Sequence, residues 1–109
     1  ISIEPVDINS SISCELTTTA NTWNTGFVIN NIKVTNTGNT SISGWTVIMS
    51  FADHMSFVNG WTGNFSQSGQ DVIVTNKPYN GQLSPGQSIT FGLQGEKNGA
   101  FQAPTCVGQ

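Results

Sequence analysis

The chain has 109 residues and a formal net charge of −3, a length that fits one domain with a modest core. Only 8% of the residues are charged, against about a quarter in an ordinary soluble domain. Three scattered lysines without any arginine exclude a nucleic-acid partner, and no apolar run approaches the roughly 18 residues of a membrane span.

The first predicted strand contains one of the two cysteines. Ile12, Cys14 and Leu16 share a parity, which indicates a strand with one buried face. Cys106 lies near the opposite end of the chain, so a disulfide would close nearly the whole domain into one loop, worth about 4–5 kcal/mol. Two separate buried thiols are the alternative. The polar, Asn- and Thr-rich composition is typical of a secreted protein and favours the disulfide.

The next apolar segment changes phase. Phe27 and Ile29 alternate in one phase, whereas Ile32 and Val34 alternate in the other. Because a strand keeps one face buried, the change requires an extra residue. Asn30-Asn31 is the natural place for such a β-bulge.

Two later segments also alternate with a period of two, and no segment has a helical period. Their apolar positions are Trp45, Val47, Met49 and Phe51 in the first, and Ile89, Phe91 and Leu93 in the second. A shorter strand, Asp71-Val72-Ile73-Val74-Thr75, is predicted after the turn Ser68-Gly69-Gln70. Turn residues separate these short segments, as in sandwiches and jelly rolls. We therefore predict an all-β fold, an antiparallel β-sandwich, formed by a single domain over residues 1–109.

Three other aromatic residues have neighbours that a buried strand would not have. Trp23, Trp61 and Tyr79 each lie among Asn, Thr, Gly or Pro, which predicts turns with an exposed backbone. Two tryptophans and a tyrosine in such turns suggest a binding patch. The alternative is that the rings fold back as lids over the ends of the core.

Exposed rings of this kind suit a sugar ligand. A pyranose with equatorial hydroxyls has two apolar faces of C–H groups, which stack on aromatic rings while the hydroxyl edge hydrogen-bonds to amides. Burial at about 25 cal/mol per Å² makes each half-covered ring worth about 1–3 kcal/mol. A polar, nearly uncharged surface also suits a neutral, polyhydroxylated ligand.

The chain resembles the family 2 carbohydrate-binding modules of bacterial cellulases and xylanases over nearly the whole globule, from about Cys14 to Cys106. Each matching motif is weak alone, but their order and spacing together are specific. The motifs are Trp23-Asn24-Thr25-Gly26-Phe27, Val34-Thr35-Asn36-Thr37-Gly38, Gly44-Trp45-Thr46, Asn59-Gly60-Trp61, Ser66-Gln67-Ser68-Gly69, Tyr79-Asn80-Gly81, Pro85-Gly86 and Phe91-Gly92.

The resemblance implies jelly-roll topology and a disulfide joining the two ends of the domain, here Cys14 and Cys106. It also implies a flat cellulose-binding strip of three coplanar rings. The positions that match these rings are Trp23, Trp61 and Tyr79.

Polar groups flank this strip in the family and would bind the sugar hydroxyls. The positions that match are Asn30 (or Asn31, because of the extra residue in that strand), Asn59 and Gln94. Trp45 matches a buried tryptophan of the family and is expected not to bind.

Position 26 distinguishes two subgroups of the family. Xylan-binding members carry an arginine three residues after the first ring, which turns that ring out of plane, whereas Gly26 leaves Trp23 free to lie flat. That subgroup also usually lacks the third ring, which Tyr79 supplies here. We therefore expect cellulose or a related β-1,4-glucan as the ligand, with xylan or chitin as the alternative. A positive φ is a second reason for glycine at position 26.

We expect no catalysis, no cofactor and no metal. A glycosidase needs two carboxylates flanking one bond, and the six acidic residues show no visible pair. His54 beside Asp53 is the one candidate for acid–base or metal chemistry, but a lone histidine in a polar turn is more often solvated. A structural β-sandwich spacer without ligand is the rival hypothesis.

The chain begins at Ile1 without an initiator methionine. We expect it to be a piece of a larger, secreted glycoside hydrolase found outside the cell. In that protein the module would bring a covalently linked catalytic domain to the polysaccharide.

Overall fold

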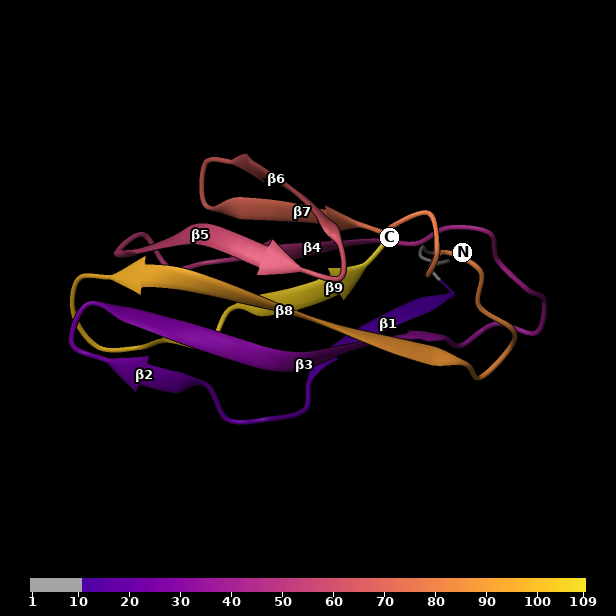
Figure 1. The fold of residues 1–109 in the computed structure, drawn as a ribbon, viewed down its shortest axis with the longest axis horizontal. Helices are drawn as coiled ribbons and strands as arrows, with labels where there is room; N and C mark the ends of the chain where they lie inside the picture. Colours follow the sequence, from indigo (N-terminus) through magenta and orange to yellow (C-terminus); the bar gives the residue numbers. More distant parts are fainter. Residues whose placement is uncertain (1–10) are drawn as a thin grey trace, which may run out of the picture.

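The computed structural model describes residues 11–109, and the expected fragment start at Ile1 lies outside that range. Within the described residues the chain forms two antiparallel sheets (Figure 1). The five-stranded sheet has the order β1-β3-β8-β5, with β2 also paired to β3, and the four-stranded sheet has the order β6-β7-β4-β9. The predicted antiparallel β-sandwich is confirmed. The strands are β1 (Ile12–Leu16), β2 (Asn21–Trp23), β3 (Gly26–Asn36), β4 (Thr46–Ser50), β5 (Met55–Trp61), β6 (Asn64–Ser68), β7 (Asp71–Thr75), β8 (Ser88–Lys97) and β9 (Thr105–Gly108).

The long strand β3 contains the predicted bulge. Its pairing with β8 shifts register between Ile29 and Ile32, and Asn31 within the shift has a φ of 55°. The Asn31 carbonyl oxygen accepts a hydrogen bond from the Thr17 hydroxyl at 2.6 Å, and the preceding carbonyl accepts one from Thr18 at 2.7 Å. The bulge separates two halves of β3, so that β1 pairs with one end and β2 with the other (Figure 1).

The core between the two sheets contains most of the residues that alternate in the sequence. Trp45 is only 2% exposed, as expected for a tryptophan outside the binding strip. Asn36 is the buried polar residue among those described, and its amide nitrogen donates to the carbonyl oxygens of Thr40 and Leu83, both at 2.9 Å. The core therefore holds its one polar side chain by hydrogen bonds. Its apolar members are Phe27, Ile29, Ile32, Val34, Trp45, Val47, Met49, Phe51, Met55, Val72, Val74, Leu83, Phe91 and Leu93.

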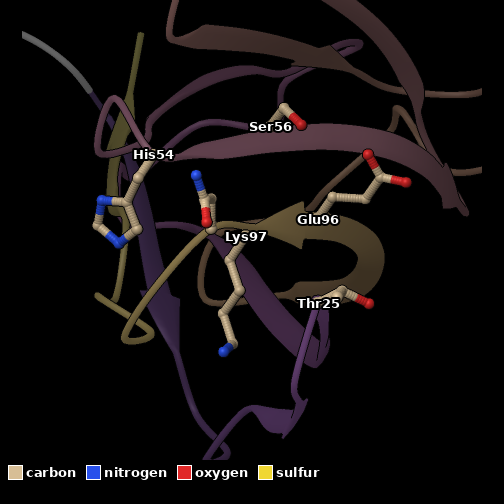
Figure 2. Close-up of a pocket in the computed structure, with 6 residues that line it drawn as sticks. Thr25, His54, Ser56, Glu96 and Lys97 are labelled. Atoms are coloured by element: carbon tan, nitrogen blue, oxygen red, sulfur yellow. The ribbon is translucent and has the colours of Figure 1, made fainter.

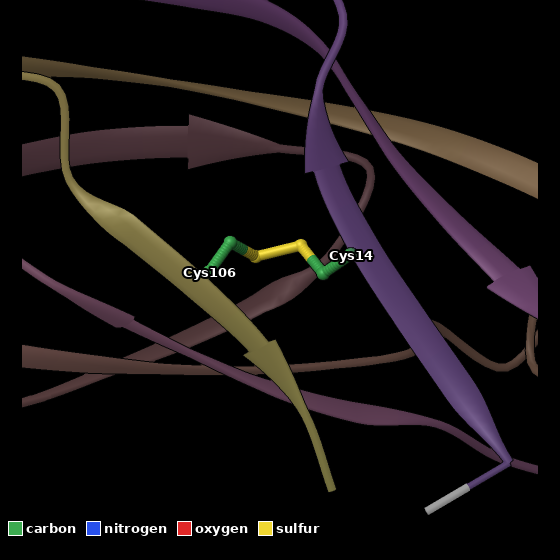
Figure 3. Close-up of a disulfide and its surroundings, with 2 residues drawn as sticks. All are labelled: Cys14 and Cys106. Atoms are coloured by element: carbon green, nitrogen blue, oxygen red, sulfur yellow. A yellow bond between two sulfur atoms is a disulfide. The ribbon is translucent and has the colours of Figure 1, made fainter.

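Cys14 and Cys106 form the predicted disulfide, with their Cα atoms 5.5 Å apart, so the alternative of two separate thiols is excluded. The bond joins β1 to β9, one strand from each sheet (Figure 3). It therefore connects the two layers of the sandwich as well as the two ends of the chain. Such bonds persist in oxidising compartments.

Candidate functional site

The three aromatic residues expected to form a patch are exposed, with exposed fractions of 44% for Trp23, 42% for Trp61 and 75% for Tyr79. This exposure disfavours the alternative in which the rings cover the ends of the core. The prediction of turns for both tryptophans is wrong, because Trp23 is the last residue of β2 and Trp61 is the last residue of β5. Tyr79 lies in the connection between β7 and β8, as the turn sequence predicts.

Trp23 lies against the backbone of Gly26. The two residues are cross-strand partners in the pairing of β2 with β3, and a Cβ atom on Gly26 would lie 2.7 Å from three indole atoms. Any side chain at position 26 must therefore displace the ring. Gly26 is not among the glycines with a positive φ, so the need for glycine here is steric and comes from the ring.

Trp61 has the same arrangement on strand β8. Its cross-strand partner is Gly92, and a Cβ atom on Gly92 would overlap with three indole atoms of Trp61. We call Gly26 and Gly92 the supporting glycines. Only Gly26 has a role predicted from the sequence, although the motif Phe91-Gly92 contains the second supporting glycine.

The strand register places both supporting glycines on the outer face of the five-stranded sheet. Gly26 pairs with Glu96 on β8. Gly92 has the same parity as Glu96, and side chains alternate between faces along a strand. Leu93, of the opposite parity, is fully buried in the core. One indole therefore lies over β3 and the other over β8, on a diagonal across a single face.

Gln94 lies between the two supporting glycines on this face. Its cross-strand neighbours are Val28 on β3 and Asn59 on β5. Asn59 is exposed and Gln94 is half-buried, and neither amide makes a side-chain hydrogen bond with residues 11–109. Both are therefore free to bind a ligand. In the β3 bulge, Asn31 is exposed and Asn30 is half-buried.

Hydrogen bonds of Asn80 hold the loop that contains Tyr79 in place. Its side-chain amide donates to the Thr62 carbonyl oxygen at 2.9 Å, and Thr62 directly follows Trp61. The main-chain carbonyl oxygen of Asn80 accepts a hydrogen bond from the indole Nε1 of buried Trp45, also at 2.9 Å. Asn80 thus links the loop to the end of β5 and to the core. From the sequence, Asn80 has no predicted role beyond its place in the Tyr79-Asn80-Gly81 motif.

The described residues offer little for catalysis. Residues 11–109 contain no group of three or more His, Cys, Asp or Glu side chains placed to hold a metal ion. His54 Nδ1 lies 3.8 Å from an Asp53 carboxylate oxygen, but that carboxylate is 99% exposed. The His54 Nε2 atom hydrogen-bonds to the Ala100 carbonyl oxygen at 2.6 Å. The same stretch of chain forms no helix that is long and apolar enough to cross a membrane.

A β-sandwich with exposed aromatic rings and free amides on one sheet face has the form of a carbohydrate-binding module. The chain belongs to the CBM_2 family, whose model is described as a cellulose binding domain and matches residues 12–108. It is therefore a non-catalytic module, homologous to the modules of bacterial cellulases and xylanases.

Individual relatives support this assignment. The chain is 41% identical over 96 residues to Exoglucanase A of Cellulomonas fimi, covering 88% of this chain and 11% of that protein. Its fold is similar to that of the chitin-binding domain of Chi18aC from Streptomyces coelicolor, with a TM-score of 0.66 and 31% identity over 88% of this chain and 90% of that one.

The fold is also similar to that of the cellulose-binding family 2 domain of ScLPMO10C, with a TM-score of 0.62 and 26% identity over 91% of this chain and 93% of that one. The chain spans only 11%, 8% and 16% of the first three curated relatives. The sequence similarity therefore concerns one module of much longer proteins.

Proposed function

We propose that this module binds the flat face of crystalline cellulose through Trp23, Trp61 and Tyr79. The observation that carries the proposal is that both indoles lie against glycines on one outer sheet face, Gly26 and Gly92. A flat aromatic surface suits the C–H faces of β-linked glucose units, and each half-covered ring contributes about 1–3 kcal/mol. The two indoles, fixed at the ends of β2 and β5, also lose little conformational entropy on binding.

The free amides on this face complement the rings in the proposed mode. Gln94 lies between the supporting glycines, with Asn59 beside it on β5, and Asn30 lies in the bulge of β3. An amide has both donors and acceptors, as does a sugar hydroxyl, so these three side chains suit the hydroxyl edges of a glucan. We assign them to orientation of the chain, and the rings to most of the affinity.

We further propose that residues 1–109 form one module of a larger, secreted glycoside hydrolase. Two observations support this role: the much greater length of relatives such as Exoglucanase A, and the disulfide between Cys14 and Cys106. A covalently linked catalytic domain would be held at high effective concentration on the polysaccharide while the module is bound.

A binding panel tests the proposed ligand. Depletion of the module from solution by microcrystalline cellulose, chitin and insoluble xylan should show the strongest binding to cellulose. Chitin is the second candidate, because the chain shares its fold and 31% identity with a chitin-binding domain. Stronger binding to chitin or xylan than to cellulose would overturn the proposal, and binding to none of the three would favour a structural spacer.

Replacing a supporting glycine should lift the ring above it. We expect Gly26→Arg to weaken binding to microcrystalline cellulose by up to one ring's share, about 1–3 kcal/mol, because even a Cβ atom at position 26 lies 2.7 Å from the Trp23 indole. Gly92→Ala should act in the same way on Trp61. Depletion isotherms measure the loss for each variant.

A double-mutant cycle separates ring displacement from general damage. In a Trp61→Ala background, Gly92→Ala should cost little further affinity, because no indole remains to be displaced. In the same way, Gly26→Arg should have little effect after Trp23→Ala. If the losses instead add in full, the glycines act through the backbone and not through the rings.

A further inference from the structure

An open, polar pocket lies at the end of the sheet next to Trp23. Its volume is about 340 Å³, and Figure 2 shows the side chains around it. None of the residues proposed above to bind cellulose lines it. The pocket is lined by Thr25, His54, Ser56, Glu96, Lys97 and Asn98.

The two basic side chains of the pocket already have protein partners. The Lys97 ammonium donates to the carbonyl oxygens of Asn24 at 3.3 Å and Gly99 at 2.9 Å. The His54 Nε2 atom hydrogen-bonds to the Ala100 carbonyl oxygen at 2.6 Å. These groups hold the loops around the pocket together.

Three of the other four side chains, all except Asn98, present hydroxyl or carboxylate oxygens without a partner among the described residues. Thr25, Ser56 and Glu96 make no side-chain hydrogen bond with residues 11–109, and Glu96 and Ser56 are exposed. In Figure 2 the oxygens of these three side chains point to one side, while the His54 ring and the Lys97 ammonium point away from it. This part of the pocket therefore consists of hydroxyls and one carboxylate.

Strand register places Glu96 on the strand next to the one beneath the Trp23 indole. Glu96 is the direct partner of Gly26 on one side and of Ser56 on the other. Trp23 lies over Gly26, so Glu96 is one strand spacing, about 4.8 Å, from the strand beneath the indole. A sugar ring stacked on Trp23 would therefore have its hydroxyl edge toward Glu96.

We propose that this pocket is a hydroxyl-binding subsite for the sugar that stacks on Trp23, with the Glu96 carboxylate as its main acceptor. The proposal rests on the proposed function and adds a charged contact to it. A carboxylate accepts at two oxygens, which matches two neighbouring hydroxyls of a neutral sugar. Hydrogen bonds to a charged acceptor are roughly twice as strong as neutral ones.

The same carboxylate selects against acidic polysaccharides. A uronic acid on Trp23 would bring a second negative charge close to Glu96, and the Lys97 ammonium points away from that carboxylate (Figure 2). The ligand class assigned to this pocket is therefore a neutral sugar with free neighbouring hydroxyls.

Binding isotherms of the intact module on microcrystalline cellulose test the subsite. Glu96→Ala should weaken binding about tenfold, the value of a hydrogen bond to a charged group. Glu96→Gln should lose less, because the amide keeps one acceptor oxygen. The matched control is Glu15→Ala on β1, an exposed strand position paired with Lys33, which removes the same charge away from the pocket and should bind like the parent.

The results distinguish the subsite from the proposed function itself. If the parent binds cellulose and the Glu96→Ala variant binds it as tightly as the Glu15→Ala variant does, the subsite is overturned and the cellulose proposal stands. A parent that does not bind cellulose overturns both. Thermal melts of the variants verify that each is folded. Weaker cellulose binding by Glu96→Ala with an unchanged melting temperature supports the subsite.

Discussion

Replacement of Trp23, Trp61 and Tyr79 by alanine in one variant is expected to reduce binding to microcrystalline cellulose at least about a hundredfold. Each ring contributes about 1–3 kcal/mol, so the three together contribute at least about 3 kcal/mol, and about 1.4 kcal/mol corresponds to a tenfold change in affinity. The fold should persist, because all three rings are exposed. Depletion isotherms measure the loss.

Two controls test whether the loss of binding is specific to the three exposed rings. Val107→Ala removes an apolar side chain that is 55% exposed on β9, in the other sheet, and should leave binding unchanged. The triple variant keeps one tryptophan, Trp45, which is buried, so its fluorescence reports whether the core is intact. A folded triple variant that binds like the parent would remove the strip from the site and favour the spacer hypothesis.

The buried strands could be predicted from the sequence because a sandwich enforces a period of two. The apolar run after the turn at Ser68-Gly69-Gln70 predicted a strand over Asp71–Thr75, which is β7, and the change of phase after Ile29 located the bulge of β3. In both cases the signal is local. One strand face must be apolar, and a one-residue slip would expose it.

Two edge strands, β5 and β6, were missed because their patterns are weaker than that of β1, the edge strand that was predicted. β5 is an edge strand of its sheet, and its register with β8 shifts between Phe57 and Asn59. This shift leaves Val58 exposed and interrupts the alternation in the sequence. β6 is also an edge strand, and of its five residues only Phe65 is partly buried. A pattern of burial cannot reveal a strand that buries so little.

Some residues of the candidate site could likewise be predicted from local sequence, and others could not. Trp23, Trp61 and Tyr79 could be proposed because their immediate neighbours are polar. The roles of Gly92 and Asn80 depend on contacts between distant segments. Gly92 lies beneath Trp61, and the Asn80 side chain donates a hydrogen bond to the carbonyl oxygen of Thr62. Only strand register and loop geometry bring these pairs together, so the motifs Phe91-Gly92 and Tyr79-Asn80-Gly81 could not by themselves reveal the two contacts.

Loss of the disulfide is expected to destabilise the module strongly without changing its ligand affinity. The bond between Cys14 and Cys106 spans 92 positions, and the chain-entropy model assigns about 4–5 kcal/mol to a loop of this length. A domain of this size is stable by about 5–15 kcal/mol, so the double variant Cys14→Ala/Cys106→Ala should melt roughly 20 °C lower. Urea unfolding curves of the parent and the variant measure the difference in the free energy of unfolding.

Cellulose binding of the same double variant should match that of the parent at temperatures well below its melting point. The bond lies between β1 and β9, whereas the indoles rest on β3 and β8 through Gly26 and Gly92. Those two strands are paired with each other along most of their length, so the core and the strand pairing hold the aromatic face in place. Weaker binding by a variant that is still fully folded would show that the link between the two sheets also shapes the binding face. Chemical reduction of the parent provides an independent check, because it breaks the same bond without changing any side chain in the core.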